Sequence, residues 1–112
     1  MAFHDEELNR DVLDRMKAAG DDLKTVRPVD FSHVFLDGRS AEAFAEHVHG
    51  CALRADVEES GCVPDMPWDV TVTIDMAPSP EAVTATEAEL NGIAASYGGR
   101  ADGWGCLSIT EA

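Results

Sequence analysis

Residues 68–76 read W-D-V-T-V-T-I-D-M, with apolar and polar side chains in strict alternation. This period of two is typical of a β-strand that turns one face to the core and the other to solvent. The stretch therefore predicts a strand whose inner side chains are Val70, Val72 and Ile74. The core assignment depends on this pattern, because a one-residue error in register would exchange the two faces.

The segment after this strand carries the start signals of a helix. Ser79 is suited to cap the helix, Pro80 to open its first turn, and Glu81 to face the positive end of its dipole. The glycines at 98–99 end the helix. Its predicted apolar face consists of Val83, Leu90, Ile93 and Tyr97.

Upstream of residue 68, the chain predicts a strand, a helix and another strand. Residues 27–36 are rich in Val and Phe and precede an Asp37-Gly38 turn. Ser40 then predicts the N-cap of a helix, and residues 53–58 alternate as a half-buried strand does. The inner face of this helix is predicted to carry Phe44, Val48 and Cys51.

The two ends of the chain add a helix and a strand. Apolar residues at Leu8, Val12 and Met16 recur at helical spacing, which predicts an amphipathic helix from about residue 4 to residue 19. Residues 100–110 contain further apolar side chains and predict a last strand.

This order of elements predicts one α+β domain over residues 1–112. Residues 26–110 follow the βαββαβ order of a ferredoxin-like split βαβ sandwich, preceded by the amphipathic helix within residues 1–24. Right-handed crossovers put the first and third strands in the middle and both later helices on one sheet face. The other face is polar, and we expect the N-terminal helix to cover Val34 and Leu36 there.

The charge of the chain is unusually negative. Its 22 acidic residues outnumber 8 basic ones, which gives a formal net charge of −14. Such a field repels phosphate backbones and anionic membranes and attracts basic partners. A surface adapted only for solubility or high salt explains the same number equally well.

The chain shows none of the usual targeting or catalytic patterns. It begins without a signal-peptide pattern and has no apolar run long enough to cross a bilayer, so we expect a cytoplasmic protein with free cysteines. His47 and Cys51 share a helical side, but two ligands do not make a zinc site. His33 is expected to be a core or edge histidine. We predict no metal, no cofactor and no catalytic residue.

One short motif needs a specific explanation. The run Asp102-Gly103-Trp104-Gly105 places two glycines inside a predicted strand, where glycine usually marks a bulge or a close approach. Trp104 is then either a core anchor or an exposed binding residue.

The same motif carries a family resemblance. It lies just after a helix that ends at Tyr97-Gly98-Gly99, the strand at 68–76 precedes that helix, and the chain starts with an acidic amphipathic segment. In these features the chain resembles the regulator of ribonuclease activity B family, protein inhibitors of ribonuclease E. The resemblance implies a ferredoxin-like fold and a non-enzymatic modulator that binds the endonuclease outside its catalytic half and alters RNA turnover.

The leading hypothesis is therefore a regulator that binds a basic protein segment, such as a ribonuclease E scaffold region, and not nucleic acid or membrane directly. The predicted protein-binding residues are Asp56, Glu58, Asp69, Asp75, Asp102, Gly103, Trp104 and Gly105. A second hypothesis is a small enzyme or ligand-binding domain that uses the sheet face near Trp104. A third is a homo-oligomer formed through the edge strand at 53–58, against the expectation of a monomer or weak oligomer.

Overall fold

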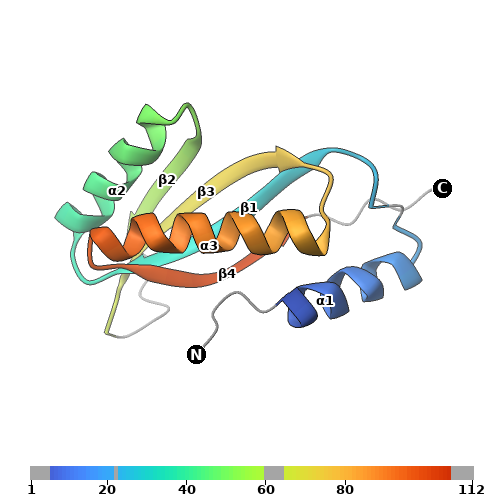
Figure 1. Ribbon diagram of the computed structural model, residues 1–112. Coiled ribbons are helices and arrows are strands. Elements are labelled where there is room, and N and C mark those ends of the chain that lie inside the picture. Colours follow the sequence, from blue (N-terminus) through green and yellow to red (C-terminus); the bar gives the residue numbers. More distant parts are fainter. Residues whose placement is uncertain (1–5, 22, 60–64, 107–112) are drawn as a thin grey trace.

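The computed structural model describes residues 6–21, 23–59 and 65–106. Within these ranges, three helices and four strands follow one another (Figure 1). They are α1 (Glu6–Ala18), β1 (Arg27–Phe35), α2 (Gly38–Gly50), β2 (Arg54–Glu59), β3 (Trp68–Met76), α3 (Pro80–Ser96) and β4 (Arg100–Cys106). The protein is thus an α+β protein, as predicted.

The predicted elements are all present within the described residues. Strand β3 has the predicted bounds, and Ser79 caps α3 by accepting a hydrogen bond from the amide of Ala82 at 3.1 Å. Helix α2 begins earlier than predicted, because Asp37 and not Ser40 is its N-cap. The predicted extensions of α1 back to residue 4 and of β4 on to residue 110 lie outside the described residues. No helix in the described ranges is long and apolar enough to span a membrane.

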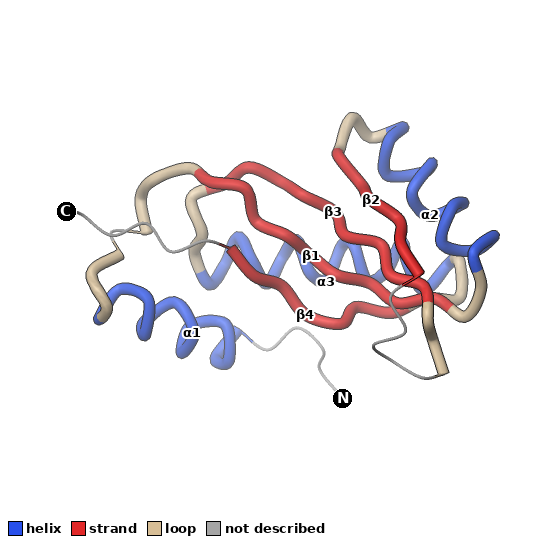
Figure 2. Tube along the Cα trace, turned by 180° about the vertical axis from the view of Figure 1, so that it is seen from behind, coloured by secondary structure: helices blue, strands red, loops and turns tan. Residues whose placement is uncertain are grey.

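The four strands form one antiparallel sheet in the order β2-β3-β1-β4. The predicted middle position of the first and third strands is therefore correct. Helices α2 and α3 pack on one face of this sheet, and the view from behind shows the strands lying in front of α3 (Figure 2). The opposite side, which we call the open face, carries the polar residues of β3.

The core lies between the sheet and these two helices. The register sets Phe31 opposite Val72 and His33 opposite Val70, so odd residues of β1 share a face with even residues of β3. Six residues from the predicted inner and apolar faces are buried there: Phe44, Val48, Val70, Val72, Val83 and Leu90. The predicted burial of Ile74 and Ile93 is only partial, because both line a pocket described below.

Helix α1 does not lie where the sequence pattern placed it. It packs against α3 beside the β4 edge and leaves the open face uncovered (Figures 1 and 2). Leu36 is accordingly 66% exposed, although Val34 is buried. The prediction was wrong because the apolar stripe of α1 is weak: Leu8 stays 62% exposed, and Leu13 is the residue that becomes buried.

One glycine is required by packing. A Cβ atom at Gly99 would collide with the ring of Phe35, so the chain passes directly over that ring at the entry to β4. The glycines that end α3 therefore also allow β4 to approach β1.

Candidate protein-binding surface

The open face gathers carboxylates from two neighbouring strands. Glu58 of β2 lies directly opposite Asp69 of β3, and Asp56 lies opposite Thr71. Asp56 and Glu58 are exposed, whereas Asp69 is half-buried. Like charges that face each other across two strands repel, which costs stability. A basic partner would relieve this repulsion.

Asp69 is the most perturbed carboxyl of the face. Partial burial, followed by the charges of Asp102 and Glu58, raises the pKa of the Asp69 carboxyl above its ordinary value of 3.8. Its Oδ1 atom is buried and accepts no hydrogen bond from the part of the chain that the structure describes. Asp102 therefore belongs electrostatically with Asp69 and Glu58. We call these three residues the acidic cluster.

The rest of the open face is more mixed. Asp75 is exposed but lies near the far end of β3, opposite Pro28. Between it and the acidic cluster, the Thr73 hydroxyl donates a hydrogen bond to Asp30 at 2.6 Å. Arg54 also faces this side, opposite Thr73. Asp75 is thus a negative charge on the same face that is separate from the acidic cluster.

Trp104 points to the other side of the sheet. It pairs with Phe31, whose side chain lies in the core, and it packs against that core while remaining half-buried. Its indole Nε1 donates a hydrogen bond of 2.8 Å to Oδ1 of Asn9 in α1. Trp104 therefore does not join the acidic cluster in one surface.

The two glycines beside Trp104, Gly103 and Gly105, differ in backbone conformation. Gly103 takes a φ of +125°, which side-chain-bearing residues rarely adopt, next to the register shift between β1 and β4. Among the described residues, no atom would contact a Cβ atom at Gly103 or at Gly105, so neither glycine is explained by close packing. Both residues are exposed on the β4 edge. The bulge at Gly103 is what separates Asp102 and Trp104 onto different sides.

Asn9 is the centre of a polar contact that the sequence pattern missed. Its Nδ2 donates hydrogen bonds to Oε1 of Glu87 at 2.8 Å and to the hydroxyl of Thr84 at 2.9 Å. Asn9 and Glu87 are each only 6% exposed. We call Asn9, Thr84, Glu87 and Trp104 the polar seam. No local signal identifies it, because Asn9 is 75 to 95 residues away from the other three members along the chain.

A buried ion pair fixes the connection from α1 to the sheet. Arg27 donates from Nη1 to Oδ2 of Asp21 at 2.6 Å and from Nη2 to Oδ1 at 2.9 Å, with both side chains almost fully buried. The hydrogen bonds to Asp21 raise the pKa of the Arg27 guanidinium. Burial raises the pKa of the nearby Cys106 thiol, and the Arg27 charge opposes that effect. Such bidentate geometry is directional and holds the two segments in one arrangement.

The three histidines among the described residues have structural contacts. His33 is buried against Phe44, with ring centroids 5.1 Å apart, and burial lowers its pKa to about 4. His47 shares a 2.9 Å hydrogen bond with the Tyr97 hydroxyl, and His49 contacts the carbonyl of Ala55. Within the described ranges, no group of three or more His, Cys, Asp or Glu side chains is placed to hold a metal ion.

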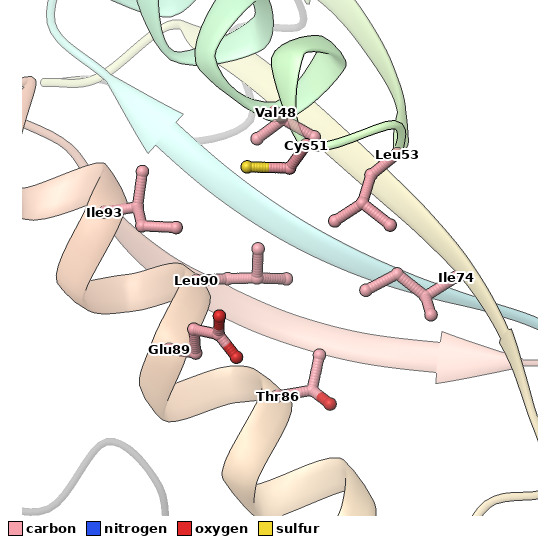
Figure 3. A pocket seen from close by; sticks show the side chains of 8 residues that line it. All are labelled: Val48, Cys51, Leu53, Ile74, Thr86, Glu89, Leu90 and Ile93. Carbon is pink, nitrogen blue, oxygen red and sulfur yellow. The ribbon is translucent and has the colours of Figure 1, made fainter.

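A small apolar pocket opens between α2, α3 and β3. It has a volume of about 120 Å³, and Figure 3 shows side chains from both helices and from the strand side converging on it. The residues that line it are Val48, Cys51, Leu53, Ile74, Thr86, Glu89, Leu90 and Ile93. The sequence had assigned Ile74, Leu90 and Ile93 to the core, so the pocket is a defect in core packing that no periodicity revealed.

Comparison with known proteins gives one family. The sequence profile described as "Regulator of ribonuclease activity B" matches residues 6–106, which is nearly the whole chain. The match covers every helix and strand described above, including α1 and the glycine-tryptophan motif of β4. A search of curated proteins found no match.

Proposed function

We propose that this chain, which belongs to the regulator of ribonuclease activity B family, is a cytoplasmic, non-enzymatic protein that regulates RNA turnover by binding a ribonuclease. The family regulates ribonuclease activity. The partner we propose is a basic, non-catalytic segment of a ribonuclease E type endonuclease. The proposal also states that the segment from β1 to β4 forms a ferredoxin-like sandwich and that the partner binds to the open face of its sheet.

The observation that carries the proposal is the uncovered acidic cluster. Glu58, Asp69 and Asp102 come together from β2, β3 and β4 on a face where, among the described residues, no helix packs. The cluster attracts cationic side chains, and the net charge of −14 on the whole chain strengthens this attraction.

Charge complementarity acts mainly on the rate of association. Exposed charges raise the on-rate and lose influence as salt increases, because screening acts over about 8 to 10 Å at ordinary ionic strength. The proposal therefore predicts binding that is fast at low salt and strongly salt-dependent.

The test is to reverse the charge of Asp69 and Asp75 together. The variant Asp69→Lys/Asp75→Lys is expected to associate with a ribonuclease E scaffold fragment at least about tenfold more slowly at low salt, with a flatter salt dependence. The matched control is Asp11→Lys/Asp14→Lys, which makes the same charge change on exposed positions of α1. Stopped-flow or surface-binding kinetics across salt concentrations measure both.

The control separates a local surface from overall charge. If the two double variants slow association equally, the open face is not the contact surface. If neither slows it, the basic-partner proposal fails.

A further inference from the structure

We infer that the outer edge of β2 binds the basic segment of the partner as an added β-strand, which lies beside the acidic residues of β2. The inference rests on the proposed function and deepens it, because it states the backbone conformation that the partner adopts and the place on the sheet where it binds.

Strand β2 ends the sheet on one side. In the order β2-β3-β1-β4 it pairs with β3, and among the described residues no strand pairs with its outer side. Its residues, Arg54–Glu59, pair with β3 in a continuous register. A regular edge strand presents a row of backbone N–H and C=O groups that can pair with a further strand.

The other edge of the sheet is less suited to such pairing. The register between β4 and β1 shifts between Ser32 and His33, and Gly103 of β4 takes a positive φ beside this shift. Bulges of this kind interrupt the row of hydrogen-bonding groups on an edge. Helix α1 also lies beside β4 (Figures 1 and 2). An added strand is therefore expected at β2.

The charges along β2 favour a basic strand. The exposed residues of β2 are three acids, Asp56, Glu58 and Glu59, and one base, Arg54. Asp56 and Glu58 belong to the open face, whereas Val57 packs against the core and is half-buried. A segment that alternates basic and apolar residues would place cations beside Asp56 and Glu58 and an apolar side chain beside Val57.

Helix α2 adds carboxylates on the other side of the same edge. His49 of α2 contacts the carbonyl oxygen of Ala55 at 3.2 Å, so this side of the helix reaches β2. Helical spacing places Glu42 and Glu46 on the same side of α2 as His49, and both are exposed. Carboxylates are therefore available to an added strand on both faces of the sheet.

A second copy of the chain fits this edge less well than a basic segment does. It would bring its own net charge of −14 and a second set of β2 acids to the edge. Like charges that face each other across two strands destabilise the pairing, and charged edge strands commonly prevent the association of identical chains. The charges that attract a basic segment thus oppose the pairing of two copies.

The test uses a synthetic peptide that alternates arginine and valine, and two versions with methylated backbone amides. One version is methylated at every valine and the other at every arginine. In an extended strand the N–H groups of alternate residues point to opposite edges, so each version loses hydrogen bonds on one edge only. Calorimetric titration of the full chain is expected to show that one methylated version binds at least about tenfold more weakly than the unmethylated peptide, and the other within about twofold.

Hydrogen exchange on the full chain locates the bound peptide. The unmethylated peptide is expected to slow the exchange of those β2 amides that do not bond to β3, and to leave the exchange of β4 amides unchanged.

A pair of charge variants tests the contribution of α2. Glu42→Gln/Glu46→Gln is expected to weaken binding of the unmethylated peptide about threefold more than Asp11→Asn/Asp14→Asn does. This matched control removes the same charge from exposed positions of α1.

The outcomes separate this inference from the proposed function. If both methylated versions bind as tightly as the unmethylated peptide, or if both lose binding, the peptide does not add to one edge as a strand and the inference alone fails. Slowed exchange at β4 in place of β2, or equal effects of the two double variants, overturns it as well. Slowed exchange of β2 amides that depends on protein concentration without peptide also overturns it, because a second copy then occupies the edge. Failure of the unmethylated peptide to bind overturns the inference and the basic-partner proposal together.

Discussion

Helix α3 lies between two other helices, α1 and α2, and the sides that it turns toward them differ in kind (Figure 1). Toward α1 it uses the polar seam, in which Asn9 bonds to Thr84 and Glu87 of α3 and to Trp104 of β4. Toward α2 it uses apolar side chains such as Leu90 and Ile93, and there the packing leaves a pocket. Hydrogen bonds fix a helix in one orientation even where the helix buries little surface. Apolar packing without such bonds tolerates an opening.

This difference suggests that the two sides of α3 have different structural roles. The polar seam and the Arg27–Asp21 pair hold α1 beside β4 although α1 buries little apolar surface. The α2 side carries more apolar surface than it buries, and part of this surface is exposed at the pocket. The first side is therefore expected to be sensitive to the loss of single polar atoms, and the second to be tolerant.

The largest expected effect is the loss of the buried ion pair. Asp21→Asn removes the charge that pairs with a buried guanidinium and is expected to lower the free energy of unfolding by about 3 to 5 kcal/mol. Chemical denaturation measures this, with the exposed Asp14→Asn as the control, expected to change stability by less than about 0.5 kcal/mol. A double variant, Asp21→Leu/Arg27→Met, is expected to regain part of the loss, because no charge is then left buried. A loss of less than 1 kcal/mol in Asp21→Asn would show that the ion pair does not anchor α1.

A middle-sized effect is expected within the polar seam. Asn9→Ala removes the acceptor of the Trp104 indole and a donor to buried Glu87, and is expected to cost about 2 kcal/mol. A double-mutant cycle with Trp104→Phe, which removes the indole N–H together with part of the ring, is expected to give a coupling energy of about 1 kcal/mol.

The control cycle pairs Asn9→Ala with Ile93→Ala on the other side of α3. The two changes are expected to add within about 0.5 kcal/mol, because they share no contact partner. Additivity in both cycles would mean that Trp104 and Asn9 are not coupled, and the distinction between the two sides of α3 would then lose its basis.

The smallest expected effect has the opposite sign. Asp69→Asn removes a carboxylate whose pKa is raised by burial and by its acidic neighbours, so the variant is expected to be more stable than the parent at pH 7, by about 1 kcal/mol or less. Because folding raises this pKa, the ionised carboxylate destabilises the fold. The difference is fully present above the folded-state pKa and disappears as pH falls below 3.8, the unfolded value.

Thermal unfolding across pH measures this, with the exposed Asp75→Asn as the control on the same face. The same Asp69→Asn protein is expected to bind the ribonuclease fragment more slowly. A variant that is neither more stable nor slower to bind would remove Asp69 from the proposed contact surface.

The sequence by itself determined the sheet and the faces of its strands. The alternation at 68–76 predicted which side chains of β3 enter the core, because a strand has only two faces and its register cannot slip without exposing Val70 and Val72. Local signals also predicted the Ser79 cap and the end of α3, since each depends on a few adjacent residues. The acidic side of β2 and β3 followed from the same alternation.

Tertiary structure alone decided the position of α1, the direction of Trp104 and the pocket. Asn9 and Trp104 are 95 residues apart, and no spacing rule links them. The bulge at Gly103 turned Trp104 away from Asp102, although the two are near neighbours in sequence. The pocket depends on how far α2 and α3 diverge over the sheet, which is set by the sum of many packing contacts and is not encoded in the period of either helix.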